Sequence, residues 1–207
     1  MPRQDIPAPI PFNPLDKKHL GESVAEALLE SPIHQLPPDR FIGAGIYAIY
    51  YVGDFEAYRA LSQANRNDQF LRPIYVGKAV PPGARKGGFG LGAEPGEVLS
   101  NRLKQHYKSV QDANNLDEHD FYCRYLVVED IWIPLAESLL IEKFQPVWNR
   151  ILDGFGNHDV GGGRLDQKRS SWDEVHPGRV WANSLNPCAQ TGDVLIQRVK
   201  DFLDSNE

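Results

Sequence analysis

The stretch AGIYAIYYV, residues 44–52, decides how the chain can fold, together with PIYVGKA at residues 73–79. Both are short runs rich in Ile, Val and Tyr that are bounded by Gly or Pro, a pattern typical of β-strands in a half-buried sheet. Each run sets a tyrosine, Tyr47 or Tyr75, close to a glycine. A glycine inside a strand commonly marks a close approach by another backbone or a ligand. On these residues alone, two core tyrosines in an ordinary β-meander are the simpler interpretation.

The regions around these two strands predict further helices and a third strand. Apolar residues at spacings of three and four predict an amphipathic helix over residues 16–31, and Asp54 is the expected N-cap of a helix over 55–64. The same reasoning predicts a helix over 97–114, a strand over 121–128, a helix over 131–145 and a helix over 193–203. We therefore expect an α+β fold with a small three-stranded, mixed or antiparallel sheet flanked by helices.

Two of the predicted helices carry polar residues whose positions on the helix suggest a functional role. Arg102 and His106 are four residues apart, so their side chains project together from the 97–114 helix. Glu137 shares a face of the 131–145 helix with apolar residues, where an unpaired carboxylate is seldom found. We expect a cation to meet Glu137.

Composition places the chain among ordinary globular proteins. It has 207 residues, 41% of them hydrophobic, enough for one domain with its own core. Cys123 and Cys188 stand alone, and indicate neither a disulfide framework nor a metal cluster. Residues 1–14 are Pro-rich and lack the apolar core of a signal peptide, and no apolar run approaches the ~20 residues of a membrane helix. We expect a cytoplasmic protein without membrane association.

Charge is unevenly distributed along the chain. The net charge is −6 and the pI is near 5.5, which argues against indiscriminate binding to a polyanion. Acidic residues concentrate at 112–120, 129–130 and 201–207. The candidate contacts to a polyanion are the clustered basic residues Arg85, Lys86, Lys104, Lys108, Arg164, Lys168 and Arg169. Solvated surface charge is the alternative for each cluster.

The order of these elements and their polar residues resembles the GIY-YIG nuclease family. The marks of that family stand here as Gly45-Ile46-Tyr47, Tyr75-Val76-Gly77-Lys78, Arg102 with His106, and Glu137 followed by Pro146-x-Trp148-Asn149. The resemblance covers about residues 43–149. Two features depart from the usual pattern: the tyrosines are 75 − 47 = 28 positions apart, which leaves room for an inserted helix, and histidine replaces a common tyrosine at position 106. Histidine there is also seen in the restriction-endonuclease branch of the family.

The resemblance implies a core with additions built around it. Residues 1–42 are an N-terminal arm and helix, and residues 43–149 are the GIY-YIG nuclease core with an insertion at 53–71 and a loop at 80–96. Residues 150–207 are a C-terminal extension, glycine-rich at first and then tryptophan-containing, that packs on the core, on DNA or on both. Because no separate DNA-binding module is visible, the chain looks like a type II restriction endonuclease.

Phosphodiester hydrolysis needs an activated water, neutralised phosphoryl charge and a stabilised leaving oxygen. The single carboxylate of Glu137 suits a Mg²⁺ ion that keeps most of its waters, and Mn²⁺ can substitute for it. The planar guanidinium of Arg102 matches a phosphate, and His106 can hydrogen-bond to a phosphate oxygen or a tyrosine hydroxyl. Asn149 is expected to orient its neighbours in the site, and no organic cofactor is expected.

The family resemblance implies that Tyr47 activates the water, while Tyr75 shares that role or positions the phosphate. Tyrosine has a reference pKa of about 10, so it needs a drop of roughly three units to act as a base near neutrality. Burial acts in the opposite direction, and the drop must come from cations such as Lys78, Arg102 or the metal. Which of Tyr47, Tyr75 and His106 is the general base stays open.

The resemblance thus implies a Mg²⁺-dependent endonuclease that cuts double-stranded DNA at a short palindromic site. A homodimer would read the palindrome and cut both strands, and arginines in the additions favour a site containing G and C. The helices over 16–31 and 193–203 are apolar surfaces that either form the dimer contact or cover the sheet. Two alternatives stay open: a structure-specific repair or recombination nuclease, and a non-catalytic DNA-binding protein that retains the fold.

Overall fold

The computed structural model describes residues 13, 15–81, 94–158 and 166–205. Its elements in chain order are α1 (Lys17–Glu30), β1 (His34–Gln35), β2 (Gly45–Tyr51), the 3₁₀ turn η1 (Glu56–Tyr58), α2 (Arg59–Asn65), β3 (Tyr75–Ala79), α3 (Val98–Asp112), η3 (Glu118–Asp120), β4 (Phe121–Val127), α4 (Ile133–Phe144), α5 (Val147–Arg150), α6 (Ser171–Val175), η4 (Val180–Ser184) and α7 (Gly192–Asp204). Every strand and long helix expected from the sequence is present within a few residues of its expected bounds.

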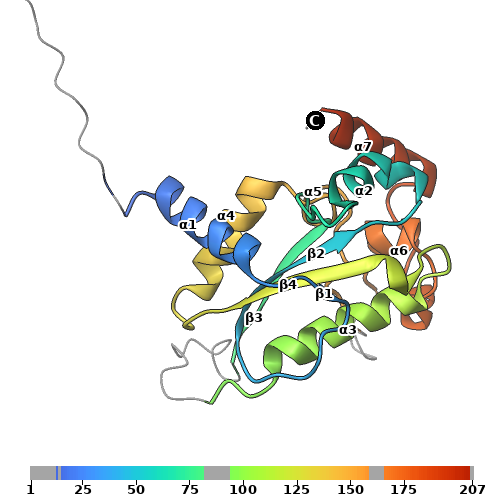
Figure 1. The fold of residues 1–207 in the computed structure, drawn as a ribbon. Helices are drawn as coiled ribbons and strands as arrows, with labels where there is room; N and C mark the ends of the chain where they lie inside the picture. The colour runs from blue at the N-terminus through green and yellow to red at the C-terminus, as the bar shows by residue number, and fades with distance from the viewer. Residues whose placement is uncertain (1–12, 14, 82–93, 159–165, 206–207) are drawn as a thin grey trace, which may run out of the picture.

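The strands of the described residues form one antiparallel sheet in the order β1-β4-β2-β3 (Figure 1). The predicted α+β class is confirmed, and β3 is an edge strand. The sheet has a fourth strand that the sequence does not predict, because β1 consists of His34 and Gln35 alone, paired with β4. Two polar residues carry no apolar alternation by which a strand can be recognised.

β2 is buried along its whole length because helices cover both faces of the sheet. Alternate side chains of a strand point to opposite faces. Ile46 and Ala48 join the apolar cluster under α1 and α4, whereas Tyr47 and Ile49 join the cluster formed with α3, α5, α6 and α7. The sequence predicts half-buried strands, and β2 differs because each face has its own helical layer.

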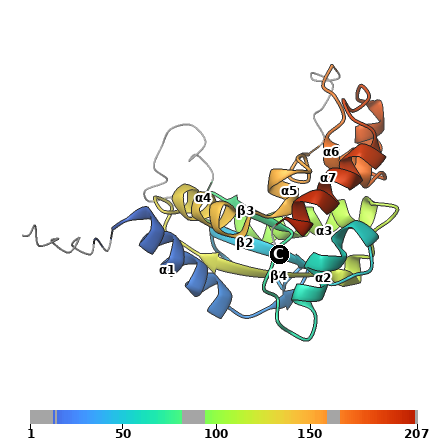
Figure 2. The same ribbon diagram turned by 90° about the horizontal axis from the view of Figure 1, so that it is seen from above.

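The terminal helices lie at opposite ends of the molecule, with α1 beside α4 at one end and α6 and α7 at the other (Figures 1 and 2). The apolar side of α1 is buried through Ala25 and Leu28, and that of α7 through Val199 and Leu203. Both helices therefore contribute to the core, and a dimer contact through one of them stays a prediction. None of the helices in the described residues is long and apolar enough to cross a bilayer.

The helix of the insertion begins later than expected. Residues 56–58 form η1, and α2 starts only at Arg59, so Asp54 is not its N-cap. The exposed Asp54 carboxylate pairs instead with the Arg66 guanidinium. The Phe55 N–H donates to the Tyr51 hydroxyl at 2.9 Å, which ties the start of the insertion to β2.

A buried chain of hydrogen bonds joins the insertion to the C-terminal extension. Trp148 Nε1 donates to the Tyr58 hydroxyl at 2.8 Å, and that hydroxyl lies 2.5 Å from His176 Nε2. Burial lowers the pKa of His176 to about 3, so its ring is neutral, accepting at Nε2 and donating from Nδ1 to Asn115 Oδ1 at 2.9 Å. The buried polar atoms of these side chains thus have hydrogen-bond partners, and His176 ties the extension to the insertion.

Candidate active site

The expected site residues gather around β3, the edge strand. Residues opposite each other in an antiparallel pair share a face, so Tyr47 lies on the same face as Gly77, whereas Lys78 lies on the other face with Ile46. The first face is covered by α3, which carries Arg102 and His106, and the second by α4, which carries Glu137. Groups from the two faces can therefore meet only around the edge of β3.

Tyr47 and His106 form a buried pair on the α3 face. The Tyr47 hydroxyl lies 2.6 Å from His106 Nε2. Burial, followed by the neighbouring Tyr75, raises the pKa of Tyr47 well above 10. Burial, followed by the charge of Arg102, lowers the pKa of His106 well below 6.5. Both groups are therefore neutral at pH 7, and the Tyr47 O–H donates to the imidazole.

Steric contacts explain why glycine stands at position 77 and at position 45. A Cβ on Gly77 would lie 2.4 Å from the Tyr47 hydroxyl oxygen and 2.6 Å from Tyr47 Cζ. A Cβ on Gly45 would lie 2.0 Å from the carbonyl oxygen of Leu126 on β4. The first glycine makes room for the Tyr47 ring across β3, and the second lets β4 approach β2, so each marks a close approach as the sequence suggested.

Tyr75 lies beside this pair. Its ring centroid is 5.2 Å from that of His106 and 6.2 Å from that of Tyr47. Burial raises the pKa of Tyr75, while the positive charge of Arg102 lowers it in part and Glu137 raises it. Arg102 is thus a cation that acts on both tyrosines, but burial outweighs it in the chain without DNA.

The Arg102 guanidinium is held at the mouth of the site by a turn at residues 154–157. Its Nη2 donates to the carbonyl oxygen of Gly156 at 3.0 Å, and its Nη1 donates to Gln105 Oε1 at 3.2 Å and contacts His158 Nε2. Among the described residues these partners are a carbonyl, an amide and an imidazole, with no carboxylate. In this part of the chain Arg102 is therefore not one half of a surface salt bridge.

Glu137 meets its expected cation in Lys78, whose Nζ lies 2.7 Å from Glu137 Oε2. The Glu137 side chain is 19% exposed, and Lys78 was a candidate for lowering a tyrosine pKa but pairs here with the carboxylate. A partly open carboxylate fits Mg²⁺, which binds through one or two carboxylates together with phosphate oxygens and retained waters. A cation at Glu137 would compete with Lys78 for Oε2.

Another group of possible metal ligands lies outside the site. Asp117, Glu118 and His119 approach one another on the turn before β4. His119 Nδ1 is 2.8 Å from Asp117 Oδ1, and both side chains are largely exposed. We assign no metal to this turn.

Asn149 fixes the open edge of β3. Its Oδ1 accepts from the Val76 N–H and its Nδ2 donates to the Val76 carbonyl, both at 2.8 Å. The Trp148 N–H donates to the Ile74 carbonyl at 3.0 Å. Asn149 therefore hydrogen-bonds like a neighbouring strand and holds the backbone between Tyr75 and Gly77, while its role in the reaction stays a prediction.

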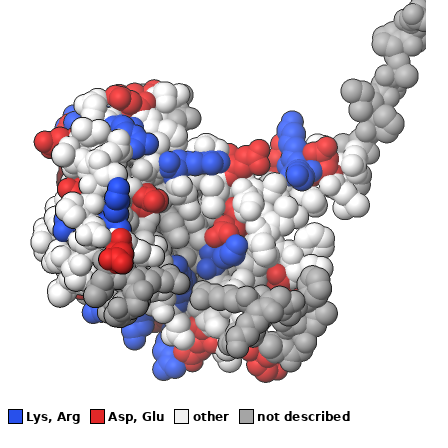
Figure 3. Space-filling view, turned by 180° about the vertical axis from the view of Figure 1, so that it is seen from behind, with Lys and Arg blue, Asp and Glu red and all other residues white. Residues whose placement is uncertain are grey.

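The expected DNA contacts are only partly described. Arg85, Lys86 and Arg164 lie outside the described residues. Lys104, Lys108 and Lys168 are exposed, with Lys108 Nζ 4.0 Å from Asp112 Oδ1, whereas Arg169 is half-buried and its Nη1 lies 3.4 Å from Glu174 Oε2. Basic and acidic side chains are interspersed on the face seen in Figure 3. Net charge alone therefore does not locate a DNA surface.

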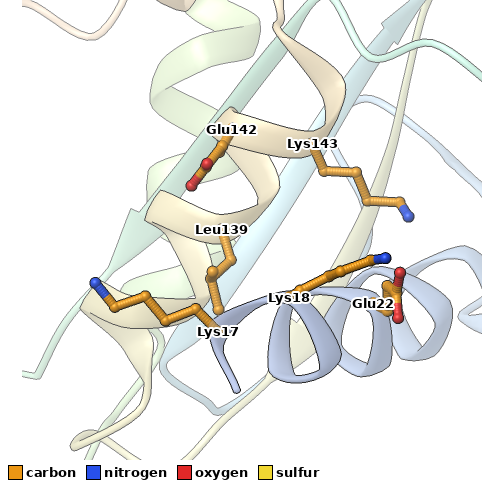
Figure 4. A pocket seen from close by; sticks show the side chains of 7 residues that line it. Lys17, Lys18, Glu22, Leu139, Glu142 and Lys143 are labelled. Carbon is orange, nitrogen blue, oxygen red and sulfur yellow. The ribbon is translucent and has the colours of Figure 1, made fainter. Parts of the chain in front are cut away.

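A groove of about 290 Å³ between α1 and α4 is separate from these residues. Its lining consists of Lys17, Lys18, Gly21, Glu22, Leu139, Glu142 and Lys143. Figure 4 shows charged side chains arranged around Leu139. None of the expected site residues lines it.

Three residues of the site escaped the sequence analysis. Phe155 stacks on His106 with centroids 4.5 Å apart and an interplanar angle of 18°. Gly156 and His158 contact Arg102. The available signal was the run GFGNH at residues 154–158, an aromatic residue between glycines shortly after Asn149.

One known family model covers the residues of the candidate site. Residues 39–203 match the family model described as the Eco29kI GIY-YIG domain. The match includes all the site elements and continues through the C-terminal extension. No curated protein matches the chain.

Proposed function

Because the chain belongs to the family of the Eco29kI GIY-YIG domain, a type II restriction endonuclease family, we propose that it cuts double-stranded DNA at a short palindromic site in a Mg²⁺-dependent reaction. The family makes it a restriction-type DNA endonuclease. The observation that carries the finer proposal is the convergence of Tyr47, Tyr75, Arg102, His106 and Glu137 around the edge of β3.

Arg102 is the proposed phosphate ligand. Its Nη2 donates to the Gly156 carbonyl oxygen of the 154–157 turn, and its Nη1 contacts His158 Nε2. A planar guanidinium can bind two phosphate oxygens at once. We infer that the scissile phosphate displaces some of these contacts and is fixed beside Tyr75.

Tyr47 and His106 are the proposed proton acceptors for the attacking water. With reference pKa values, moving a proton from tyrosine to histidine costs about 5 kcal/mol, and burial of both rings increases that cost. A free tyrosinate is therefore unfavourable. We infer that the water gives its proton to Tyr47 as Tyr47 gives its own to His106 Nε2, along the existing 2.6 Å contact.

Glu137 is the proposed Mg²⁺ ligand. When bound there, the ion would neutralise charge on the phosphate and on the departing 3′ oxygen. Lys78 would be released from Oε2 and would remain beside the same phosphate as a second positive charge. Mn²⁺ has the same preference for oxygen ligands and is expected to replace Mg²⁺.

A homodimer is the proposed assembly. One chain carries one set of site residues, and two strands of opposite polarity at a palindrome present two equivalent targets related by twofold symmetry. We propose the extension, the basic residues of the loops and α3 as the parts that contact DNA. The exposed lysines described there are Lys168 of the extension and Lys104 and Lys108 of α3.

The test is Glu137→Ala, with Glu142→Ala as its matched control on the exposed side of the same helix. Glu137→Ala is expected to abolish Mg²⁺-dependent cleavage yet keep sequence-specific binding, because the metal serves the transition state and recognition depends on other contacts. Glu142→Ala should cut like the wild type. Unimpaired turnover by Glu137→Ala would contradict the assignment of the metal to Glu137.

A further inference from the structure

Arg179 is a buried charged residue that the proposed chemistry does not use. Its side chain is almost inaccessible, and its guanidinium lies between two indole rings, 4.5 Å from the centroid of Trp172 and 4.8 Å from that of Trp181. Its Nε donates to Asp173 Oδ1 at 2.7 Å and its Nη2 to Asp173 Oδ2 at 2.8 Å. The positive charge is thus neutralised by a bidentate pair, the geometry that suits arginine.

The remaining donors of Arg179 bind the backbone of the 154–157 turn. Nη2 donates to the carbonyl oxygen of Gly154 at 2.9 Å, and Nη1 donates to those of Phe155 at 3.2 Å and Asn157 at 3.1 Å. A guanidinium has five N–H donors, so these three bonds and the two to Asp173 use all of them. One side chain therefore binds three of the carbonyls of this turn, which also has a backbone hydrogen bond from the Asn157 N–H to the Gly154 carbonyl at 3.0 Å.

The same turn contacts the candidate active site with its other side. The Phe155 ring stacks on His106, and the Gly156 carbonyl accepts from Arg102 Nη2 at 3.0 Å. The turn therefore connects Arg179 to the proposed proton acceptor through Phe155 and to the proposed phosphate ligand through Gly156. Arg179 itself touches neither reacting group.

We propose that Arg179 is a positioning residue for DNA cleavage, which fixes the 154–157 turn so that the turn holds Arg102 and His106 in their working places. This inference rests on the proposed function. The planar fork is what the role requires, because a lysine ammonium is a point charge that cannot bind three carbonyls and both oxygens of one carboxylate. A displacement of about 1 Å in a reacting group can cost a hundredfold in rate.

The experiment compares Arg179→Lys with Arg124→Lys. Arg124 is a matched control because its half-buried guanidinium also binds backbone carbonyls, those of Ser31 and Phe70, but on the α1 and α4 side of the sheet. Single-turnover cleavage rate, DNA affinity and unfolding midpoint are measured for both variants at a temperature where they are folded. We expect Arg179→Lys to lose about tenfold or more in rate with affinity within about twofold, whereas Arg124→Lys keeps the wild-type rate.

A wild-type rate in folded Arg179→Lys would overturn the inference, and so would an equal loss in Arg124→Lys, since lost stability would then explain both. Gly156→Ala acts on the turn from the opposite side, because its Cβ would lie 2.9 Å from the Tyr75 hydroxyl and 3.1 Å from Arg102 Nη2. It too should lose rate without losing affinity.

If Arg179→Lys does not fold, the cleavage rate of Gly156→Ala tests whether the position of the turn matters for catalysis. A wild-type rate in Gly156→Ala would overturn the inference, because a turn that can move without consequence needs no positioning residue. A wild-type chain that does not cut DNA would instead refute the proposed function, and this inference with it.

Discussion

Adding one methyl group at Gly77 should separate catalysis from stability. The Cβ of Gly77→Ala would lie 2.4 Å from the Tyr47 hydroxyl oxygen, 2.6 Å from Tyr47 Cζ and 3.0 Å from Tyr75 Cε1. Carbon and oxygen atoms in contact lie about 3.5 Å apart, so the Tyr47 ring must move by about 1 Å. The ring has no free space on the α3 face, because the 2.6 Å contact with His106 lies there.

Two effects of different size follow from this displacement. Overpacking a core position costs about 1–3 kcal/mol of unfolding free energy. Misplacing the proposed proton acceptor by about 1 Å costs about a hundredfold in rate. Gly77→Ala is therefore expected to fold at low temperature, bind DNA like the wild type, and cut at about one hundredth of the wild-type rate.

Gly53→Ala is the matched control. Its Cβ would lie 2.4 Å from the hydroxyl oxygen of Tyr51, also on β2, and 2.0 Å from Asp120 Oδ2, so it overpacks the same face far from His106. Urea unfolding and single-turnover cleavage are measured for both variants. Equal rates in Gly77→Ala and Gly53→Ala at similar stability would refute the reasoning, because the rate would then not depend on the position of Tyr47.

Three further outcomes are expected. Arg102→Lys keeps the charge but loses the fork, so its cleavage rate should fall by at least about tenfold, and a rate equal to the wild type would remove Arg102 from the phosphate. Burial holds the pKa of His176 at about 3, below the unfolded value of about 6.5, so unfolding takes up a proton between these pH values. Relative to His176→Gln, the wild type should lose about 1.6 kcal/mol of unfolding free energy from pH 6.5 to pH 5 in urea titrations. A difference that is independent of pH would show that the folded ring is not neutral. Mixing wild-type chains with excess Glu137→Ala chains should accumulate nicked plasmid if a dimer cuts the two strands, whereas direct linearisation in proportion to the wild-type chains would mean that one chain makes both cuts.

Local patterns revealed most of the fold and the named site residues. The runs of Ile, Val and Tyr bounded by Gly or Pro at residues 44–52 and 73–79 located β2 and β3. The spacing of Arg102 and His106 predicted that their side chains project together, and His106 lies beside Tyr47 and Tyr75. The cation beside Glu137 was expected from its apolar surroundings, although nothing in the sequence identified Lys78 as that cation.

The parts that the sequence did not reveal depend on contacts between distant segments. The role of Gly77 follows from the register that sets it opposite Tyr47, and that of Asn149 from the position of β3 at the sheet edge. Phe155 and Arg179 enter through a turn whose shape is set by the extension folding back on the core. No local periodicity encodes such contacts, so only the three-dimensional structure connects these residues to the site.

The most direct test of the account is a Mg²⁺-dependent digest of a plasmid of known sequence, in supercoiled and in linear form, with every fragment end mapped. The account predicts discrete fragments from both forms, with all ends at one short palindrome. Ends scattered without a common sequence, cutting confined to branched DNA, or no cleavage at all would contradict the proposed restriction endonuclease.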